Sequence, residues 1–209
     1  MPIKENREYR ALLLPFQQPT GEKRIDSDYY VEGYATTFND PYVMWEWDGM
    51  KYYEVIDRNA LDEADMSDVI MQLDHSGEVF ARTKMRKGKA RTLIVEPTDQ
   101  GFFIAADLTN DDPDNPGPST LYRKIDKGLI YQMSWAFTVA EEKYNKDTRT
   151  RTITKVKKVY DVSAVSIPAN PGTDIAARSY FEGVIEKEKQ EWLQRQKAIE
   201  LAKAKVLIL

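Results

Sequence analysis

The chain has 209 residues, of which 42% are hydrophobic and 31% charged, and it contains no cysteine. This composition is that of an ordinary globular domain, and it excludes disulfides, thiolate metal sites and a cysteine nucleophile. The formal net charge of −4 gives no indication of specific nucleic-acid binding or attraction to anionic membranes. No stretch approaches the roughly 18 apolar residues of a membrane span, and the N-terminal apolar run is too short for a signal peptide. We therefore expect a cytoplasmic protein.

β-Strand patterns dominate the chain up to residue 178. Runs rich in β-branched and aromatic residues, bounded by turn signals, predict strands. They lie at residues 30–38, 51–56, 68–73, 91–96, 102–108, 129–141 and 151–167. The fourth and fifth runs predict a hairpin through the turn at 97–101, and the last two a hairpin through 144–148. Short helices are expected at 59–66 and after the capping residue Ser119, ending before Gly128.

The character of the sequence changes after Ile175. Residues 179–206 contain no proline and are rich in Glu, Lys, Gln and Ala, with apolar residues at helical spacing interrupted by Glu188. This pattern predicts a long amphipathic helix. We expect a mainly β (α+β) domain over residues 1–178 and a C-terminal helical extension over residues 179–209. The extension could pack on its own domain, pair with a second copy to form a homo-oligomer, or reach into a larger assembly.

His75 is the only histidine in the chain. Histidine is the usual general base near neutral pH, because its unperturbed pKa of about 6.5 lets it take and return a proton. His75 follows an apolar run and precedes Ser76 and Gly77, so we expect it at the end of a strand, facing a loop. Any histidine-based chemistry in this chain must use it. The alternative is a histidine with a surface or capping role.

Ser134 and Asp161 are candidate partners for this base. Alternation along the strand places an apolar face toward the core, made of Tyr131, Met133, Trp135, Phe137 and Val139. Ser134 falls on the opposite face between small or polar neighbours, where a nucleophile can be held rigidly and reached; the alternative is an ordinary strand serine. Asp161 stands in an apolar strand, where an unpaired charge is costly. It is a candidate for the carboxylate that orients a catalytic histidine, the alternative being an ion pair with Lys or Arg.

Other constellations are less specific. The acidic residues between positions 107 and 114 resemble a loose calcium loop, but they lack the EF-hand spacing and its closing glutamate. Trp45 and Trp47 indicate either an exposed binding loop or the edge of a core. The basic run at 84–91 is typical of a solvated hairpin tip, with phosphate contact as the alternative. We expect no metal and no cofactor.

Read in chain order, several segments resemble the prohead serine proteases of tailed phages. They are GYA at 33–35 with Phe38, EVI at 54–56 before NAL at 59–61, DH at 74–75, GF at 101–102, AADL at 105–108, KGLIYQMSWAF at 127–137, RTIT at 151–154, DVSAV at 161–165 and PANPGT at 168–173. The resemblance covers about residues 30–178. The ordered set is more specific than any one motif within it.

The resemblance implies a fold like that of the herpesvirus assemblin protease, an antiparallel β-barrel with peripheral helices. It implies a serine endopeptidase that matures the capsid inside the immature prohead, in the cytoplasm of the bacterial host. Its substrates would be the scaffold protein, or the scaffold-like extension of the major capsid protein, and the protease itself. Carried over by position, His75 matches the base and Ser134 the nucleophile. Asp161 stands where phage members often have glutamate and herpesvirus relatives use a second histidine.

The sequence departs from the family's pattern near both expected catalytic residues. Ala81 stands where glycine is expected before Arg82. Trp135 and Ala136 replace a small residue and a glycine after the nucleophile, and the bulky Trp135 could alter access to Ser134. We expect the turn around Ala81 and Arg82 to supply backbone N–H groups that stabilise the oxyanion.

Two other functions fit the same sequence. One is a catalytically inactive capsid assembly or scaffold-docking protein built on the same fold, a role that the long charged C-terminal helix favours. The other is a carbohydrate- or metal-binding β-barrel that uses Trp45, Trp47 and the acidic residues of 107–114.

Overall fold

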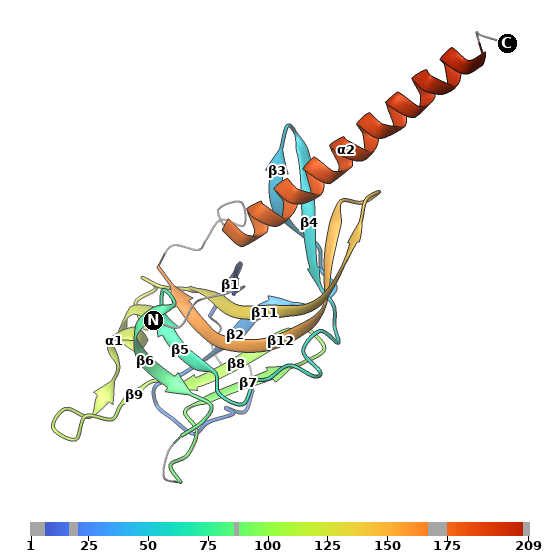
Figure 1. The fold of residues 1–209 in the computed structure, drawn as a ribbon. Helices are drawn as coiled ribbons and strands as arrows, with labels where there is room; N and C mark the ends of the chain where they lie inside the picture. Colours follow the sequence, from blue (N-terminus) through green and yellow to red (C-terminus); the bar gives the residue numbers. More distant parts are fainter. Residues whose placement is uncertain (1–6, 17–20, 86–87, 167–174, 207–209) are drawn as a thin grey trace.

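The computed structural model describes residues 7–16, 21–85, 88–166 and 175–206, and Figure 1 shows a β-rich body from which one long helix projects. The strands are β1 (Glu8–Pro15), β2 (Tyr30–Thr37), β3 (Tyr42–Trp47), β4 (Met50–Ile56), β5 (Ile70–Leu73), β6 (Ser76–Arg82), β7 (Leu93–Pro97), β8 (Gly101–Asp107), β9 (Thr109–Asn110), β10 (Gly117–Pro118), β11 (Gln132–Asn145) and β12 (Thr150–Val165). The helices are α1 (Thr120–Asp126) and α2 (Ile175–Val206). The mainly β class with a C-terminal helix is confirmed.

The local sequence signals account for most of these elements. The β7–β8 and β11–β12 hairpins are antiparallel pairs, as predicted. Ser119 caps α1, because its Oγ accepts a hydrogen bond from the Tyr122 N–H at 3.1 Å. The helix expected at 59–66 is wrong: most of these residues form consecutive turns with i to i+3 backbone bonds. β1, β3 and β6 were not expected from the sequence.

β12 organises the principal sheet, whose path is β1-β11-β12-β4-β3 with β5 and β6 attached. One side of β12 pairs antiparallel with β11 along most of its length. The other side pairs in parallel with β4 through residues 150–153 and with β5 through residues 161–164. These two parallel pairs depart from the expected antiparallel arrangement. The long strand β12 therefore has two partners along the same edge, with β4 beside its first residues and β5 beside its last residues.

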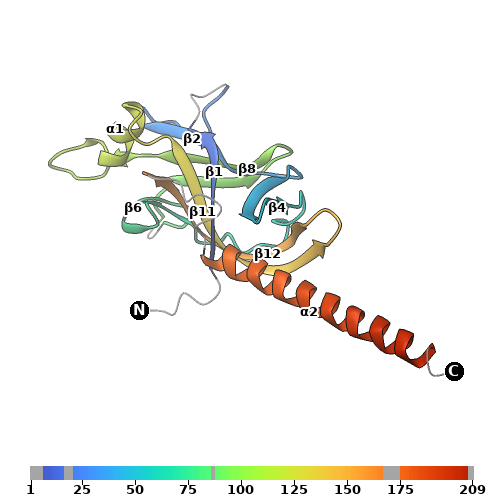
Figure 2. The ribbon, with the colours of Figure 1, turned by 90° about the horizontal axis from the view of Figure 1, so that it is seen from above.

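The hydrophobic core lies between this sheet and a three-stranded sheet of order β2-β8-β7, which Figures 1 and 2 show as a second layer. Phe102 and Ile104 of β8 and Trp135 and Phe137 of β11 are fully buried in one cluster. The Trp135 and Phe137 rings stack with centroids 3.9 Å apart. Within the described residues the pairings form separate sheets with no closed ring of strands, so the predicted barrel is not confirmed.

At Gly101, the first residue of β8, the backbones of β2 and β8 approach each other closely. A Cβ atom at this position would lie 2.1 Å from the backbone oxygen of Thr36. We therefore expect Gly101→Ala to lower the free energy of unfolding by about 3 kcal/mol, because backbone must move to remove the overlap. Gly183→Ala is the matched control: Gly183 lies in α2 with nothing within 4 Å, and alanine there should be neutral or stabilising by up to about 1 kcal/mol. Urea unfolding of both variants measures the difference, and equal stabilities would contradict this account.

A buried ionic cluster joins all five strands of the principal path. Its central members are Arg10, Glu54 and Arg151, whose side chains are 2%, 0% and 3% exposed. Arg10 Nε donates to Glu54 Oε1 at 2.5 Å, and Arg151 donates to Glu54 Oε2 at 3.0 Å. The cluster is completed by Glu8 of β1, Glu142 of β11 and Tyr42 of β3. Because buried charges must be paired, this cluster fixes how the strands align.

The first half of α2 lies against the body, where Lys146 pairs with Glu191 at 2.6 Å. Its later turns project away from the body in both views (Figures 1 and 2). Phe181 is fully buried against Met44 and Tyr52, and Trp45 stacks near Phe181 with centroids 6.4 Å apart. Trp45 therefore belongs to the edge of a core, one of its two predicted alternatives. The helix begins at Ile175, earlier than expected, and the division of the chain at residue 178 stays a prediction. Neither of the described helices is long and apolar enough to cross a membrane.

Candidate active site

His75 lies in the tight turn that joins β5 to β6. Leu73 and Ser76 pair across this turn, leaving Asp74 and His75 as its two central residues with φ of 52° and 55°. Positive φ at both positions is the geometry of a type I′ hairpin turn, where the second residue is preferentially glycine. A histidine there stores strain of about 1 kcal/mol, as is common for residues with a functional role. His75 thus follows the end of β5, as expected, but it lies in a two-residue turn between strands rather than facing a loop.

Two side-chain interactions anchor this turn to β12. Asp74 Oδ1 accepts the Ser166 N–H at 2.8 Å, and the Ser166 hydroxyl donates to the other carboxylate oxygen. The Asp74 N–H donates to the Ala164 carbonyl at 2.9 Å. The turn therefore cannot move independently of the strand that carries Asp161.

Ser134 and Asp161 reach the same place from β11 and β12. Ser134 pairs directly with Ser163, and Ala136 with Asp161, so all four residues lie on one face of the sheet. Parallel pairing sets Gln72 of β5 beside Ser163, which places the following turn over this face.

The three predicted residues are joined by hydrogen bonds in one chain. His75 Nδ1 lies 2.5 Å from Asp161 Oδ1, and His75 Nε2 lies 2.6 Å from Ser134 Oγ. An ionised carboxylate only accepts hydrogen bonds, so the Nδ1 atom carries the proton and Nε2 is free to accept the Ser134 hydroxyl proton. The fourth member is Ser163, fully buried, whose hydroxyl donates to Asp161 Oδ1 at 2.8 Å.

The site is largely withdrawn from water. The side chains of His75 and Asp161 are 16% and 6% exposed, and Ser134 is 2% exposed. Hydrogen bonds and charges act more strongly in such surroundings than in bulk water. The Tyr9 ring of β1 meets the His75 ring edge to face, with centroids 4.8 Å apart.

Sequence reasoning missed two of these contacts. Ser163 could have been found, because a residue two positions from Asp161 in a strand shares its face. Tyr9 carried no signal, because no strand was expected at its position.

Three expectations about the surroundings of the site need correction. Trp135 does not restrict access to Ser134, because its fully buried ring points into the core on the other face of β11. The segment around Ala81 and Arg82 is not a turn but part of β6, and the Arg82 N–H donates to Thr92 Oγ1 at 3.0 Å. Tyr131, expected on the core face, precedes β11 and is 55% exposed.

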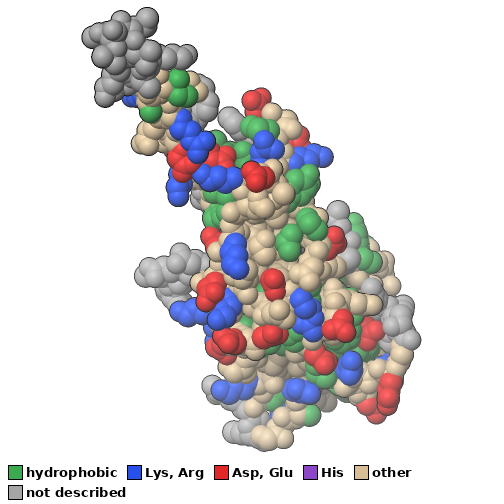
Figure 3. All heavy atoms as spheres, turned by 90° about the vertical axis from the view of Figure 1, so that its right-hand side faces the viewer, with side chains coloured by type: hydrophobic (Ala, Val, Ile, Leu, Met, Phe, Trp, Pro, Cys, Tyr) green, Lys and Arg blue, Asp and Glu red, His purple; other side chains and the backbone are tan. Residues whose placement is uncertain are grey.

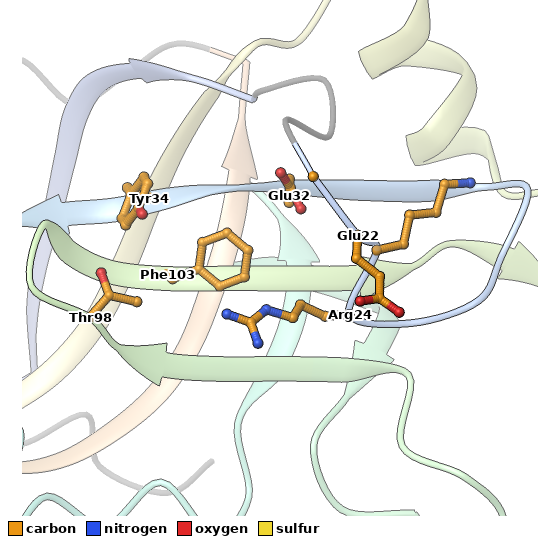
Figure 4. Close-up of a pocket in the computed structure, with 8 residues that line it drawn as sticks. Glu22, Arg24, Glu32, Tyr34, Thr98 and Phe103 are labelled. Atoms are coloured by element: carbon orange, nitrogen blue, oxygen red, sulfur yellow. The ribbon is translucent and has the colours of Figure 1, made fainter.

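The alternative binding sites find little support. A cavity of about 600 Å³ lies on the three-stranded sheet, where Figure 4 shows Tyr34 and Phe103 beside Arg24 and Glu32. None of its lining residues belongs to the Ser134 hydrogen-bond chain. Within the described ranges, no three His, Asp or Glu side chains gather as a metal site would require. On the face shown in Figure 3, Lys and Arg side chains are interspersed with Asp and Glu.

A hydroxyl, an imidazole and a carboxylate hydrogen-bonded in this order form the constellation of serine hydrolases, which recurs on unrelated folds. Comparison with protein families gives a narrower class. The model of the family described as caudovirus prohead serine protease matches residues 18–187 of the chain. The chain therefore belongs to the caudovirus prohead serine protease family, as its sequence predicted. Searches of curated proteins and of solved structures gave no match.

Proposed function

We propose that this chain is an active serine endopeptidase in which Ser134 is the nucleophile, His75 the general base and Asp161 the group that orients His75. The observation that carries the proposal is the unbroken chain Ser134 Oγ–His75 Nε2 at 2.6 Å and His75 Nδ1–Asp161 Oδ1 at 2.5 Å. Family membership supports the reaction class.

The reaction is acyl transfer in two halves. Ser134 Oγ attacks the carbonyl carbon of the scissile peptide bond while His75 Nε2 takes the hydroxyl proton. His75 then gives that proton to the leaving amine as the C–N bond breaks, which leaves an ester on Ser134. Water attacks the ester with His75 again as base, and the proton returns to Ser134 as the new carboxyl end departs. Because Ser134 is 2% exposed, neighbouring groups must move aside for a substrate carbonyl to reach it.

Asp161 has a distinct role in this scheme. Its carboxylate holds the His75 proton at Nδ1 and stabilises the imidazolium that forms in each half-reaction. The Ser163 hydroxyl, bonded to the same carboxylate oxygen, keeps Asp161 in place.

The substrates follow from the family's role in prohead maturation. We propose that the chain cleaves scaffold protein or the scaffold-like extension of the major capsid protein, and also itself, inside the immature prohead in the host cytoplasm. We also propose that the fold is related to the assemblin-like barrel and that two or more copies of the chain associate through α2. The projection of α2 from the body supports a partner-binding role for that helix.

The proposal is tested by co-expressing the chain with its capsid or scaffold protein and measuring intact masses, beside a Ser134→Ala control. Defined cuts that are absent in the control establish the serine protease and give the cleavage sequence. No cuts in either sample, with both proteins folded and associated, would support the inactive docking protein instead.

Asp161→Asn should lower kcat/KM by about 10²–10⁴-fold, less than the loss of the nucleophile, because the amide favours the wrong tautomer of His75 while leaving Ser134 in place. Steady-state cleavage of a peptide spanning an identified cut site measures this. Asp99→Asn is the control, because Asp99 is fully exposed and pairs with Arg58. An Asp161→Asn enzyme with full activity would remove Asp161 from the mechanism.

A further inference from the structure

The N-terminal strand β1 lies outside the residues that define the family match, which begins at residue 18. It nevertheless pairs with the strand that carries the nucleophile, with Ala11 directly opposite Ser134 and Tyr9 opposite Ala136. Neighbours opposite one another in a pair share a face. Tyr9 and Ala11 therefore lie on the same face of the sheet as the Ser134 hydroxyl.

We infer that Tyr9 is a positioning residue for His75 and that β1 is part of the catalytic unit. The Tyr9 ring packs against the His75 ring with centroids 4.8 Å apart and planes inclined by 72°. His75 is held in its ring plane by Asp161 at one nitrogen and Ser134 at the other. The aromatic contact adds a wall beside the imidazole, which limits its rotation about χ2 and keeps Nε2 directed at Ser134.

The register of β1 is fixed by its next residue. Arg10 is 2% exposed and lies on the opposite face from Tyr9, where it pairs with Glu54. A slip of one residue would move every β1 side chain to the other face. Such a slip would bring Arg10 out of its buried ion pair and take Tyr9 off His75. The ionic cluster thus holds the Tyr9 ring in place through two adjacent residues of one strand.

His75 being the only histidine makes this inference directly measurable, because its ring signals in an NMR spectrum need no further assignment. In the Ser134→Ala background, which prevents self-digestion, we expect a nuclear Overhauser effect between the Tyr9 and His75 ring protons. Tyr9→Leu should remove the ring-current displacement of the His75 signals, and Tyr9→Phe should keep it. Absence of the Overhauser effect in the folded protein would overturn the inference even if Tyr9→Leu does not fold.

The kinetic arm rests on the proposed function. With Ser134 intact, Tyr9→Leu should lower kcat by roughly 3- to 10-fold, the range expected for one aromatic pair. KM should change by less than about twofold, because the role assigned to Tyr9 acts on His75 and not on the substrate. Tyr9→Phe should restore wild-type kcat. Tyr34→Leu is the matched control, since Tyr34 makes an equivalent edge-to-face pair with Phe103 on the other sheet.

The outcomes separate the two proposals. Wild-type kcat in Tyr9→Leu, or equal losses in Tyr9→Phe and Tyr9→Leu, would overturn the positioning role. Equal losses in Tyr9→Leu and Tyr34→Leu would assign the effect to stability alone and would also overturn it. Activity that persists in Ser134→Ala would instead refute the proposed mechanism, and the NMR results would still decide whether Tyr9 positions the ring.

Discussion

Ser134→Ala is expected to reduce cleavage of the capsid or scaffold substrate by at least about 10⁴-fold, and its fold should be unchanged. The proposed mechanism assigns the attack to this hydroxyl, because His75 Nε2 lies 2.6 Å from Ser134 Oγ. Loss of the nucleophile in such a constellation removes most of the catalytic rate, and what remains comes from binding and oxyanion stabilisation. Quantified product masses in co-expression, supported by peptide kinetics, measure the change.

Ser67→Ala is the control for this experiment. Ser67 is exposed and its hydroxyl donates only to the nearby Asp65 at 2.7 Å. We expect wild-type cleavage from this variant. If Ser134→Ala cleaved at the wild-type rate while folding normally, another nucleophile would have to be sought.

Glu54→Gln is expected to lower the free energy of unfolding by about 3 kcal/mol, because it removes the only fully buried carboxylate of the cluster and leaves Arg10 and Arg151 to the partly exposed Glu8 and Glu142. Glu54 is fully buried between Arg10 and Arg151. The glutamine has nearly the same shape, so the loss reports charge rather than packing. Denaturant unfolding at neutral pH measures it.

The control is Glu63→Gln, a surface residue whose side chain is 74% exposed and pairs with Lys155. Exposed pairs contribute about 0–1 kcal/mol, so this variant should remain close to the wild type. Similar losses in the two variants would show that the buried cluster does not carry the stability assigned to it.

The same cluster predicts how stability depends on pH. Burial alone would raise the pKa of Glu54, but the charge and hydrogen bonds of Arg10, with those of Arg151 and Tyr42, lower it below its ordinary value of 4.5. A lowered pKa contributes stability that is fully present above the unfolded value and is lost as the pH falls through the folded value. Wild-type protein should therefore lose stability below about pH 4.5, and Glu54→Gln should lose less over that range.

Local sequence signals determined much of this protein. The start of β11 alternates, so Met133, Trp135 and Phe137 face the core and Ser134 lies on the other face. The chain has one histidine, so His75 was the only candidate for a histidine base. It has no cysteine, which excluded a cysteine nucleophile. The β7–β8 and β11–β12 hairpins, the capped helix α1, the C-terminal helix and the family were predicted from patterns that act within a few residues or recur in a fixed order.

Interactions between distant residues decided the rest. The helix expected at 59–66 became turns because Ala60 and Asp65 bond to the backbone of β12, and tertiary partners outweigh local propensity. The strand β1 has no clear sequence signal because what holds it is Arg10, a charge that is stable there only beside Glu54, 44 residues away.

The sequence by itself determined the candidates His75, Ser134 and Asp161 and the class of their chemistry. Only the tertiary structure brought them together, because the partners are 59 and 86 residues apart in the chain. Their meeting depends on the parallel pairing of β5 with β12, and the contact of Tyr9 with His75 on the pairing of β1 with β11. Pairing between strands far apart in sequence is set by the packing of the whole sheet and by buried charge pairs, which no short stretch of residues encodes.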